Sequence, residues 1–480
     1  MAMKLAGQKM LLAGDWVERE DKIDVWDPQK NERIESVPAA SREDVERAIK
    51  LAREGAPIAA NLSVRERMDI LNKAASLVEE NHEDFARTIA AEGVKTINEA
   101  RSETTRAIET LRLSAEEARR LTGESINFDQ MPGNEDRMGY YFRFPVGVVA
   151  AITPFNDPLN LVAHKLGPAV AAGNAVIIKP ATETPLSALK LADAFMKAGL
   201  PKKVLTVITG RSRDIGDSLI ESKDINMISF TGGYETGEKI SKKAGLKKLS
   251  MELGSNSPFI VCKDADLKQA AAAASSGAFA AAGQNCLSVQ RIYVEEDVYS
   301  SFKDLFLKYV REVRTGDKML ESTDMGPLIN EKEARRIEEW VEEAKNSGAA
   351  VLTGGQREGA LFQPTVLENV PENAPIVKEE IFGPVVLLFK VEHLDEALTR
   401  SNDVNYGLQA GIFTNNVNSA LKAAKSLHVG GVMINDSSDF RIDAMPFGGV
   451  KGSGLGREGV AFAIKEMSEE RIVCFKMTEE

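Results

Sequence analysis

The sequence predicts an α/β protein with two doubly wound parallel sheets that follow one another along the chain. From Gly147 onward, short apolar runs alternate with amphipathic helical patterns, an alternation typical of βαβ units. The runs form two series, at 148–152, 175–178, 204–208, 226–230 and 258–262, and then at 290–294, 385–389 and 431–434. A chain of 480 residues is long enough for two or three domains with a large buried core.

Helical periodicity fills the intervals between these runs. We expect helices at 160–171, 187–198, 214–222 and 234–244 in the first series, and at 298–312, 332–347 and 417–427 in the second. Residues 41–121 also appear helical in pattern, with a capping-box start at Ser41–Asp44 and further periodic segments at Val64–Glu80 and Ile97–Ala118. The polar stretch 122–138 predicts a connector or an edge hairpin.

Composition excludes several classes of protein. Sixty basic residues against seventy-two acidic ones give a net charge of −12, which argues against nonspecific binding of nucleic acid. Three cysteines cannot form a disulfide framework and fit a reducing compartment. The sequence has no signal peptide pattern and no apolar run of membrane-spanning length, and its four histidines show no ligand spacing. We expect a cytoplasmic protein without a metal, a nucleic-acid partner or a membrane partner.

Cys286 is the candidate nucleophile. It follows Gly283-Gln284-Asn285 at the end of a small-residue helical pattern, Ala270 to Ala282, which would leave the thiol reachable and among polar groups. Thirty-four residues upstream, Glu252 lies between apolar residues and a glycine turn and is a candidate base. The alternative is that Cys286 only fills the core as a small apolar side chain.

Three predicted strand ends lie within sixty residues of one another and favour nucleotide binding. Lys179 ends one strand, Gly210 lies in the loop after the next, and Phe230-Thr231-Gly232-Gly233 opens a helix after the third. Open α/β sheets bind ligands at the carboxyl ends of their strands, and helix N-termini accept phosphate. The one formal dinucleotide fingerprint, Gly454 to Gly459, is not preceded by a predicted strand, so we interpret it as a tight loop.

Eight segments in order resemble the aldehyde dehydrogenase superfamily, and the likeness runs from Leu12 nearly to the C-terminus. They are Thr153-Pro154-Phe155-Asn156, Lys165 to Ala169, Lys179 to Thr182, Phe230 to Gly233, Met251 to Gly254, Gly283 to Cys286, Glu380 to Pro384, and Pro446 to Gly454.

The resemblance implies an aldehyde-dehydrogenase-like fold with two doubly wound parallel-sheet domains and a small β oligomerisation arm. Residues 1–121 and 142–253, with about 447–465, would form an NAD(P)-binding Rossmann-like domain, and 254–446 a catalytic domain that carries the nucleophile. Residues 122–141 and 466–480 would form the arm, so a homodimer or homotetramer is expected.

The resemblance also implies a chemistry. Cys286 as thiolate attacks the aldehyde carbonyl, and the Asn156 amide with the Cys286 backbone N–H stabilises the oxyanion. Hydride passes to NAD or NADP, and Glu252 activates the water that releases the acid, with Lys165 relaying protons. Relatives that transfer the acyl group to coenzyme A usually lack this glutamate, so Glu252 favours hydrolysis.

For the cofactor, the resemblance implies that Lys179 and Glu380 hold the two riboses and that Phe382 packs near the nicotinamide. Thr182 stands where many NAD-preferring relatives have a glutamate, which makes use of NADP plausible, with Arg211 or Arg213 as a positive partner. The other expected cofactor-binding residues are Thr153, Pro154, Phe155, Ala181, Gly210, Phe230, Thr231, Gly232, Gly233 and Leu253.

For the substrate, Arg106 and Arg441 match arginines that grip anionic tails in branches acting on lactaldehyde, glyceraldehyde or its phosphate, and phosphono- or sulfo-aldehydes. Asn285 stands where phosphate-handling relatives often place another arginine. A small hydroxylated or singly anionic aldehyde is therefore expected. Alternatives are a semialdehyde such as succinate semialdehyde, a broad-specificity enzyme, or two arginines that only form structural salt bridges.

Two hypotheses that assign the protein to other functional classes remain open at this point. One is a cysteine hydrolase or acyltransferase that pairs Cys286 with His164 or His428. The other is a protein with this fold that has lost its activity and serves only in binding.

Overall fold

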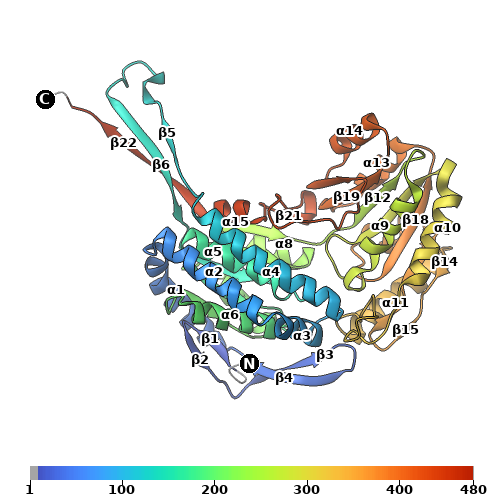
Figure 1. Ribbon diagram of the computed structural model, residues 1–480, viewed down its shortest axis with the longest axis horizontal. Helices are drawn as coiled ribbons and strands as arrows, with labels where there is room; N and C mark the ends of the chain where they lie inside the picture. The colour runs from blue at the N-terminus through green and yellow to red at the C-terminus, as the bar shows by residue number, and fades with distance from the viewer. Residues whose placement is uncertain (1–8, 479–480) are drawn as a thin grey trace.

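The computed structural model describes residues 9–478, so the ends of the expected first domain (1–8) and of the arm (479–480) lie outside the described residues. Figure 1 shows two α/β bodies side by side, the first built mainly from the blue to green part of the chain and the second from the yellow to red part. A long β-arm projects away from the first body and carries the C-terminus. The predicted α/β class is confirmed.

The first sheet has eight strands and a parallel centre. The five strands β9, β8, β7, β10 and β11 run parallel, and antiparallel strands close both edges. Their order across the sheet is β2 (Asp15–Val17), β1 (Met10–Leu12), β9 (Leu205–Val207), β8 (Ala175–Lys179), β7 (Val148–Ile152), β10 (Met227–Thr231), β11 (Lys248–Glu252) and β21 (Gly454–Leu455). The central strands are almost wholly apolar because helices cover both faces.

Nine helices belong to the first body within the described range. They are α1 (Arg42–Ala60), α2 (Val64–Glu80), α3 (His82–Glu92), α4 (Ile97–Ala118), α5 (Asn160–Ala172), α6 (Leu186–Ala198), α7 (Ser212–Glu221), α8 (Tyr234–Lys243) and α15 (Val460–Glu466). Helices α1, α2 and α4 each begin with a complete capping box, which satisfies amides that the helix cannot pair. Helix α3 was not recognised in the sequence because only Asn81 separates it from α2.

The second sheet has seven strands, all parallel except β14 at one edge. In order they are β14 (Ala350–Thr353), β17 (Thr365–Glu368), β18 (Val385–Val391), β13 (Val289–Glu295), β12 (Ser257–Val261), β19 (Gln409–Phe413) and β20 (Gly431–Ile434). The helices of this body are α9 (Leu267–Phe279), α10 (Glu296–Glu312), α11 (Glu331–Asn346), α12 (Pro375–Lys378), α13 (Leu394–Asn402) and α14 (Val417–Ser426).

The arm is a three-stranded antiparallel sheet in which β6 (Arg137–Pro145) lies between β5 (Glu124–Ile126) and β22 (Ser468–Lys476). The polar stretch 122–138 therefore enters a hairpin, one of the two arrangements expected for it. Two further hairpins, β3 (Lys22–Asp27) with β4 (Glu32–Pro38) and β15 (Arg357–Glu358) with β16 (Leu361–Phe362), are peripheral.

Two expectations about local structure were wrong. The helical pattern through Ala282 ends at Phe279, because Ala281 and Ala282 adopt left-handed φ angles of 49° and 54°. The glycine-rich segment 454–459 is not only a loop, since its first two residues form β21 and pair with Met251 and Glu252. Both differences from the expected structure place backbone atoms next to the site described below.

Across residues 9–478, the structure contains no helix that combines the length and the apolar character needed to cross a membrane.

Candidate active site

A cavity of about 1070 Å³ is lined by residues of both α/β bodies. Its walls come from the loops that follow β7, β8, β10 and β11 in the first body and from the nucleophile loop and residues 379–382 in the second. Of the residues expected from the sequence, those that line it are Arg106, Thr153, Pro154, Phe155, Asn156, Lys179, Ala181, Thr182, Phe230, Thr231, Gly232, Gly233, Glu252, Leu253, Cys286, Glu380, Phe382 and Arg441. Lys165 and Gly210 lie behind this wall.

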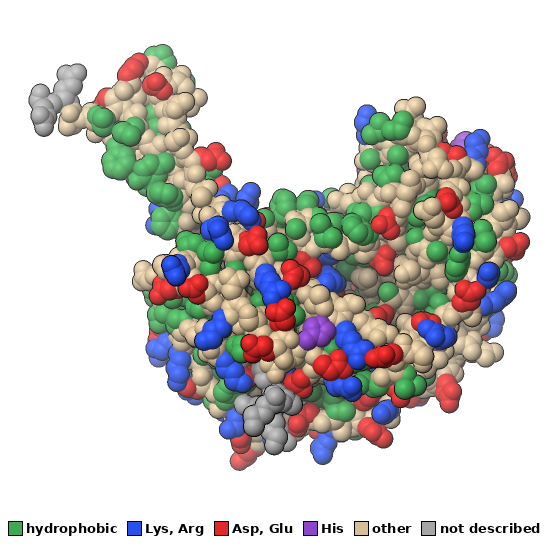
Figure 2. Space-filling model, in the orientation of Figure 1, with side chains coloured by type: hydrophobic (Ala, Val, Ile, Leu, Met, Phe, Trp, Pro, Cys, Tyr) green, Lys and Arg blue, Asp and Glu red, His purple; other side chains and the backbone are tan. Residues whose placement is uncertain are grey.

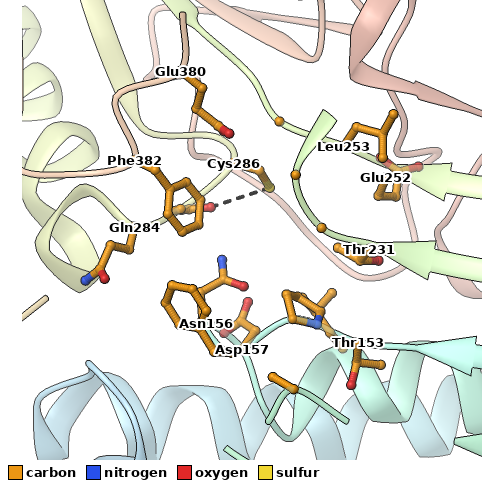
Figure 3. A pocket seen from close by; sticks show the side chains of 18 of the residues that line it. Thr153, Asn156, Asp157, Thr231, Glu252, Leu253, Gln284, Cys286, Glu380 and Phe382 are labelled. Atoms are coloured by element: carbon orange, nitrogen blue, oxygen red, sulfur yellow. Dashed lines mark hydrogen bonds between the residues drawn. The ribbon is translucent and has the colours of Figure 1, made fainter. Parts of the chain in front are cut away.

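Cys286 occupies the middle of the cavity, between Glu380 and Phe382 on one side and Glu252 and Leu253 on the other (Figure 3). The residue is partly exposed as a whole, and its sulfur lies 3.7 Å from Asn285 Oδ1. Burial raises the pKa of the thiol to about 12, and the nearby charge of Arg441 is the main influence that lowers it. The other two cysteines, Cys262 and Cys474, do not line the cavity.

The backbone before Cys286 takes a conformation that restricts its sequence. Gly283 has a φ of +69°, and a Cβ there would lie 2.2 Å from the carbonyl oxygen of Gly383. Only glycine tolerates both the positive φ angle and this close approach of the Gly383 carbonyl oxygen. The side chain of Gln284 then fastens the turn, because its Nε2 donates to Ala281 O at 3.0 Å and its Oε1 accepts from Ile329 N at 2.9 Å.

Glu252 ends β11 and is 2 % exposed. Neither carboxyl oxygen has a hydrogen-bond partner in the described part of the chain. Burial raises its pKa well above the usual range, and the neighbouring Glu458 raises it further. A carboxyl group held in this state can exchange a proton with water that enters the cavity.

Lys165 projects from α5 and is buried against Glu458, a residue that the sequence did not single out. Its Nζ donates to Glu458 Oε1 at 2.9 Å and to Ser229 Oγ at 3.1 Å. Burial opposes ionisation of Glu458, but the charges of Lys165 and Arg441 outweigh it and lower its pKa. The only available signal was the glycine-rich segment 454–459, in which Glu458 is the one acidic residue.

Arg106 and Arg441 both line the substrate side of the cavity but are held differently. Arg106 pairs with Asp443 at 3.1 Å and lies 3.8 Å from Asp157. Arg441 lies 3.5 Å from Glu458 Oε2, and its guanidinium carbon lies 3.8 Å from the centre of the Phe447 ring. The Nε of each arginine has no hydrogen-bond partner among the described residues. Arg106 is thus engaged by two carboxylates, and Arg441 by one carboxylate that Lys165 already binds.

His164 is fully buried and contacts Asp443 Oδ1 at 2.7 Å. His428 is exposed, and neither histidine lines the cavity that contains Cys286. A cysteine hydrolase with either histidine as base therefore has no support in this geometry.

The residues on the other side of Cys286 fit a dinucleotide. Lys179 is 2 % exposed, its Nζ donates to Pro180 O at 2.9 Å, and burial lowers its pKa to about 8. Glu380 accepts from Ser255 N at 2.7 Å, and burial raises its pKa to about 7. The hydroxyls of Thr153 and Thr231 have no partner within residues 9–478. These buried polar groups suit the hydroxyls and amide of a nicotinamide nucleotide.

Two glycines keep this part of the cavity open. A Cβ on Gly254 would lie 2.3 Å from Glu380 Oε2, and a Cβ on Gly232 would lie 2.5 Å from the Phe230 ring. The N-terminus of α8 follows directly at Tyr234, and no side chain caps its amides. That end of the helix can therefore accept a pyrophosphate.

The loop after β8 is where we expect the enzyme to distinguish NADP, which carries a 2′-phosphate, from NAD. Thr182 lines the cavity and donates to Gly210 O at 3.3 Å, so no carboxylate stands at this position. Ser212 also lines the cavity, whereas Arg211 contacts Lys22 O and Asp21, and Arg213 contacts Asp214. The two arginines are therefore engaged elsewhere in this structure.

A cysteine thiol between a nucleotide-sized cleft and a buried carboxyl group fits an oxidoreductase that works through a covalent intermediate. The family comparison agrees: the model of the aldehyde dehydrogenase family matches residues 16–473, and the chain belongs to that family. It is an NAD(P)⁺-dependent aldehyde dehydrogenase, and its predicted resemblance to the family is confirmed.

Several relatives are similar over nearly their whole length. A 3-sulfolactaldehyde dehydrogenase from Priestia aryabhattai is 47 % identical, with 97 % of each chain covered. A lactaldehyde dehydrogenase from Methanococcus maripaludis is 42 % identical, with 97 % of this chain and 99 % of the relative covered. The crystal structure of a glyceraldehyde-3-phosphate dehydrogenase from Methanocaldococcus jannaschii complexed with NADP has a TM-score of 0.93 and 42 % identity, covering 96 % of this chain and 100 % of the other.

The raised pKa of Cys286 gives a first prediction for the free enzyme. Only the thiolate reacts with iodoacetamide, so the rate of alkylation at Cys286 should rise about tenfold per pH unit from about pH 7 to about pH 9. Mass spectrometry of the labelled peptide, with the exposed Cys474 as internal reference, measures this rate. A plateau already at about pH 8 would contradict the prediction.

Proposed function

We propose that the enzyme oxidises a small aldehyde with a polar or anionic tail to its carboxylic acid by way of a thioester on Cys286. The observation that carries the proposal is Arg441, whose guanidinium lines the cavity beside Cys286 with its Nε unpaired in the described structure. The relatives named for sulfolactaldehyde, lactaldehyde and glyceraldehyde 3-phosphate act on small oxygenated aldehydes, which supports the same substrate class.

The first steps fall to Cys286 and Asn156. The thiol gives its proton to water, and the thiolate sulfur bonds to the aldehyde carbon as the carbonyl π electrons move to oxygen, which becomes negatively charged. The Asn156 amide and the Cys286 N–H donate to this oxygen, which stabilises it while it forms. Asn156 is 8 % exposed and is held on the loop after β7, so its amide needs little reorganisation.

Lys179 and Glu380 would hold NAD(P)⁺, which would supply the hydride acceptor. Loss of hydride from the sulfur-bound carbon would leave an acyl group on Cys286. Glu252 then takes a proton from water as the water oxygen bonds to the acyl carbon, and the carbon–sulfur bond breaks to give acid and thiol. Burial and the neighbouring Glu458, which Lys165 holds at 2.9 Å, raise the Glu252 pKa, whereas Arg441 and Lys165 oppose the rise. A raised pKa suits a general base.

Glu252→Gln separates the two halves of the reaction. With a good aldehyde, this variant should release about one equivalent of reduced cofactor per active site and then stall, because acylation precedes hydrolysis. Stopped-flow absorbance of the reduced nicotinamide measures the burst. If the burst is absent, Glu252 acts in thiolate formation instead, and rapid steady turnover would show that it is not the base.

Cysteine variants provide the controls for this experiment. Cys286→Ala should lose dehydrogenase activity and retain cofactor binding, whereas Cys262→Ala and Cys474→Ala should remain active, since neither residue lines the cavity. Substantial turnover by Cys286→Ala would overturn the assignment of the nucleophile.

The two arginines differ enough to test the substrate class. Arg441→Leu should raise KM for sulfolactaldehyde or another anionic aldehyde by about ten- to a hundredfold, since a charge-assisted hydrogen bond contributes about 1.5–3 kcal/mol. KM for propanal should change by less than about threefold. Arg106→Leu should act less selectively, because Arg106 is already paired with two carboxylates.

Steady-state kinetics with a panel of lactaldehyde, glyceraldehyde, succinate semialdehyde and anionic aldehydes, each with NAD and NADP, also distinguishes the alternatives. Equal losses for charged and neutral aldehydes would make Arg441 a structural residue.

Preference for NADP is the expected result, because Thr182 puts no negative charge where the 2′-phosphate would lie.

The arm supports assembly into a homodimer or a dimer of dimers. Strand β22 leaves one edge unpaired, and apolar side chains of Met138, Phe142, Ile472 and Phe475 are exposed along the arm. Figure 2 shows hydrophobic side chains gathered on this projection, away from the rest of the molecule. An unpaired edge with apolar neighbours favours contact with a second copy of the chain.

Replacement of Phe142 and Ile472 by Asp should therefore convert the oligomer into a monomer, as measured by light scattering at micromolar concentration. Trp26→Asp is the matched control, because Trp26 is equally exposed but lies on the peripheral hairpin of β3 and β4. A wild-type protein that is already monomeric would overturn the proposal.

We also propose that the enzyme works in the cytoplasm. All three cysteines are free, which supports a reducing compartment.

A further inference from the structure

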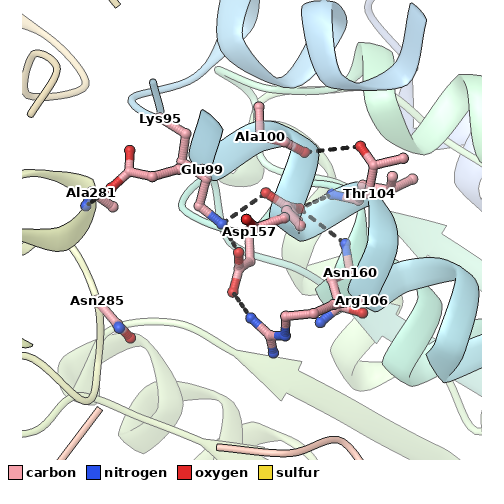
Figure 4. A network of polar contacts seen from close by, with 12 residues as sticks. Lys95, Glu99, Ala100, Thr104, Arg106, Asp157, Asn160, Ala281 and Asn285 are labelled. Atoms are coloured by element: carbon pink, nitrogen blue, oxygen red, sulfur yellow. Dashed lines mark hydrogen bonds and ion pairs between the residues drawn. The ribbon is translucent and has the colours of Figure 1, made fainter. Parts of the chain in front are cut away.

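One turn of α4 contacts both loops that supply the proposed oxyanion donors. Glu99 and Glu103 are four residues apart, so they lie on the same face of the helix. Glu99 reaches Ala281 in the loop before Cys286 of the second body (Figure 4). Glu103 reaches the loop of Asn156 in the first body. Neither glutamate lines the cavity.

Glu99 accepts hydrogen bonds from two directions. Its Oε2 accepts from Thr96 N at 2.8 Å, which completes the capping box of α4. Its Oε1 accepts from Ala281 N at 2.7 Å. Ala281 has the left-handed φ that ends the helical run before Cys286, so this bond crosses between the two bodies and fixes a strained turn.

Glu103 is 1 % exposed and holds the other loop through its backbone. Its Oε1 accepts from Leu159 N at 2.8 Å and from Asn160 N at 3.0 Å. Lys95 donates to Glu103 Oε2 at 2.8 Å and also contacts Asp157, the residue after Asn156. The stretch 157–160 that follows Asn156 is thereby held to Lys95 and α4.

We infer that Glu99 and Glu103 together set the distance between the Asn156 amide and the Cys286 N–H, and that Glu99 is a positioning residue for the oxyanion site. The two donors come from different α/β bodies, so no local backbone geometry fixes their separation. The α4 turn fixes it, because the rise of one helical turn joins the two anchoring carboxylates. This inference rests on the roles proposed above for Asn156 and Cys286.

The test compares Glu99→Ala with Glu66→Ala. Glu66 completes the same capping box on α2 through Ser63 but makes no contact with the site, so it reports the loss of a cap alone. Glu99→Ala should lower kcat for propanal about ten- to a hundredfold, because a misplaced oxyanion donor weakens transition-state stabilisation. Glu66→Ala should leave kcat within about threefold. Propanal keeps the result independent of the anion-binding proposal.

Iodoacetamide distinguishes positioning from general disorder. Alkylation of Cys286 forms no oxyanion, so Glu99→Ala should retain its alkylation rate and its affinity for NADP within about threefold while kcat falls. Glu99→Gln should restore kcat to within about threefold of wild type, because its amide oxygen can still accept from Ala281 N. Thermal melting should show a larger loss for Glu99→Ala than for Glu66→Ala, because only Glu99 also accepts from Ala281 N.

The inference is overturned if Glu99→Ala keeps its kcat, if alkylation falls by the same factor as turnover, or if Glu66→Ala loses as much. Asn156→Ala and Cys286→Ala are measured alongside. Turnover that survives in both would contradict the proposed function itself, whereas turnover lost in both but kept in Glu99→Ala contradicts only the role of Glu99.

Discussion

The site depends on how four buried charged groups share one small volume. Burial and the nearby Glu458 oppose ionisation of Glu252, while Lys165 and Arg441 supply the positive charge. Lys165 binds Glu458 directly, so Glu458 carries the negative charge. Glu252 has no hydrogen-bond partner among the described residues, so no such bond stabilises its ionised form. One lysine contact thus distinguishes Glu252, the proposed base, from Glu458, which remains ionised.

The fold makes this arrangement available. Glu252 ends β11, Lys179 ends β8, and Asn156 follows β7, all at the carboxyl edge of one parallel sheet. Parallel strands bring such ends together without long excursions of the chain. Cys286 comes from the second body, and β21 returns to β11 so that Glu458 reaches the back of the same site. Catalysis therefore requires the two bodies to keep a fixed relation, and α4 contacts loops of both.

Much of the architecture could be predicted from the sequence because the parallel strands are buried on both faces and appear as apolar runs. The central strands β8 and β10 are buried at every position, and their predicted positions agree with the structure within one residue. The motifs also singled out Cys286 and Glu252, and both line the same cavity. Helix α3 was missed because a single residue separates it from α2.

Glu458 and Glu99 could not be found in the same way, because their importance comes from contacts between segments far apart in sequence. Glu458 meets Lys165 across 293 positions, and Glu99 meets Ala281 across 182. In the sequence, Thr96-x-x-Glu99 predicts only the start of a helix. Glu99 makes its second hydrogen bond because the Ala281 amide points toward α4. Gly283 and Gln284 stabilise this turn and prevent the helix from continuing. Glu99, a helix-capping residue, thus becomes part of the active-site framework through the backbone of Ala281. The residue pattern of a single segment cannot predict such a contact.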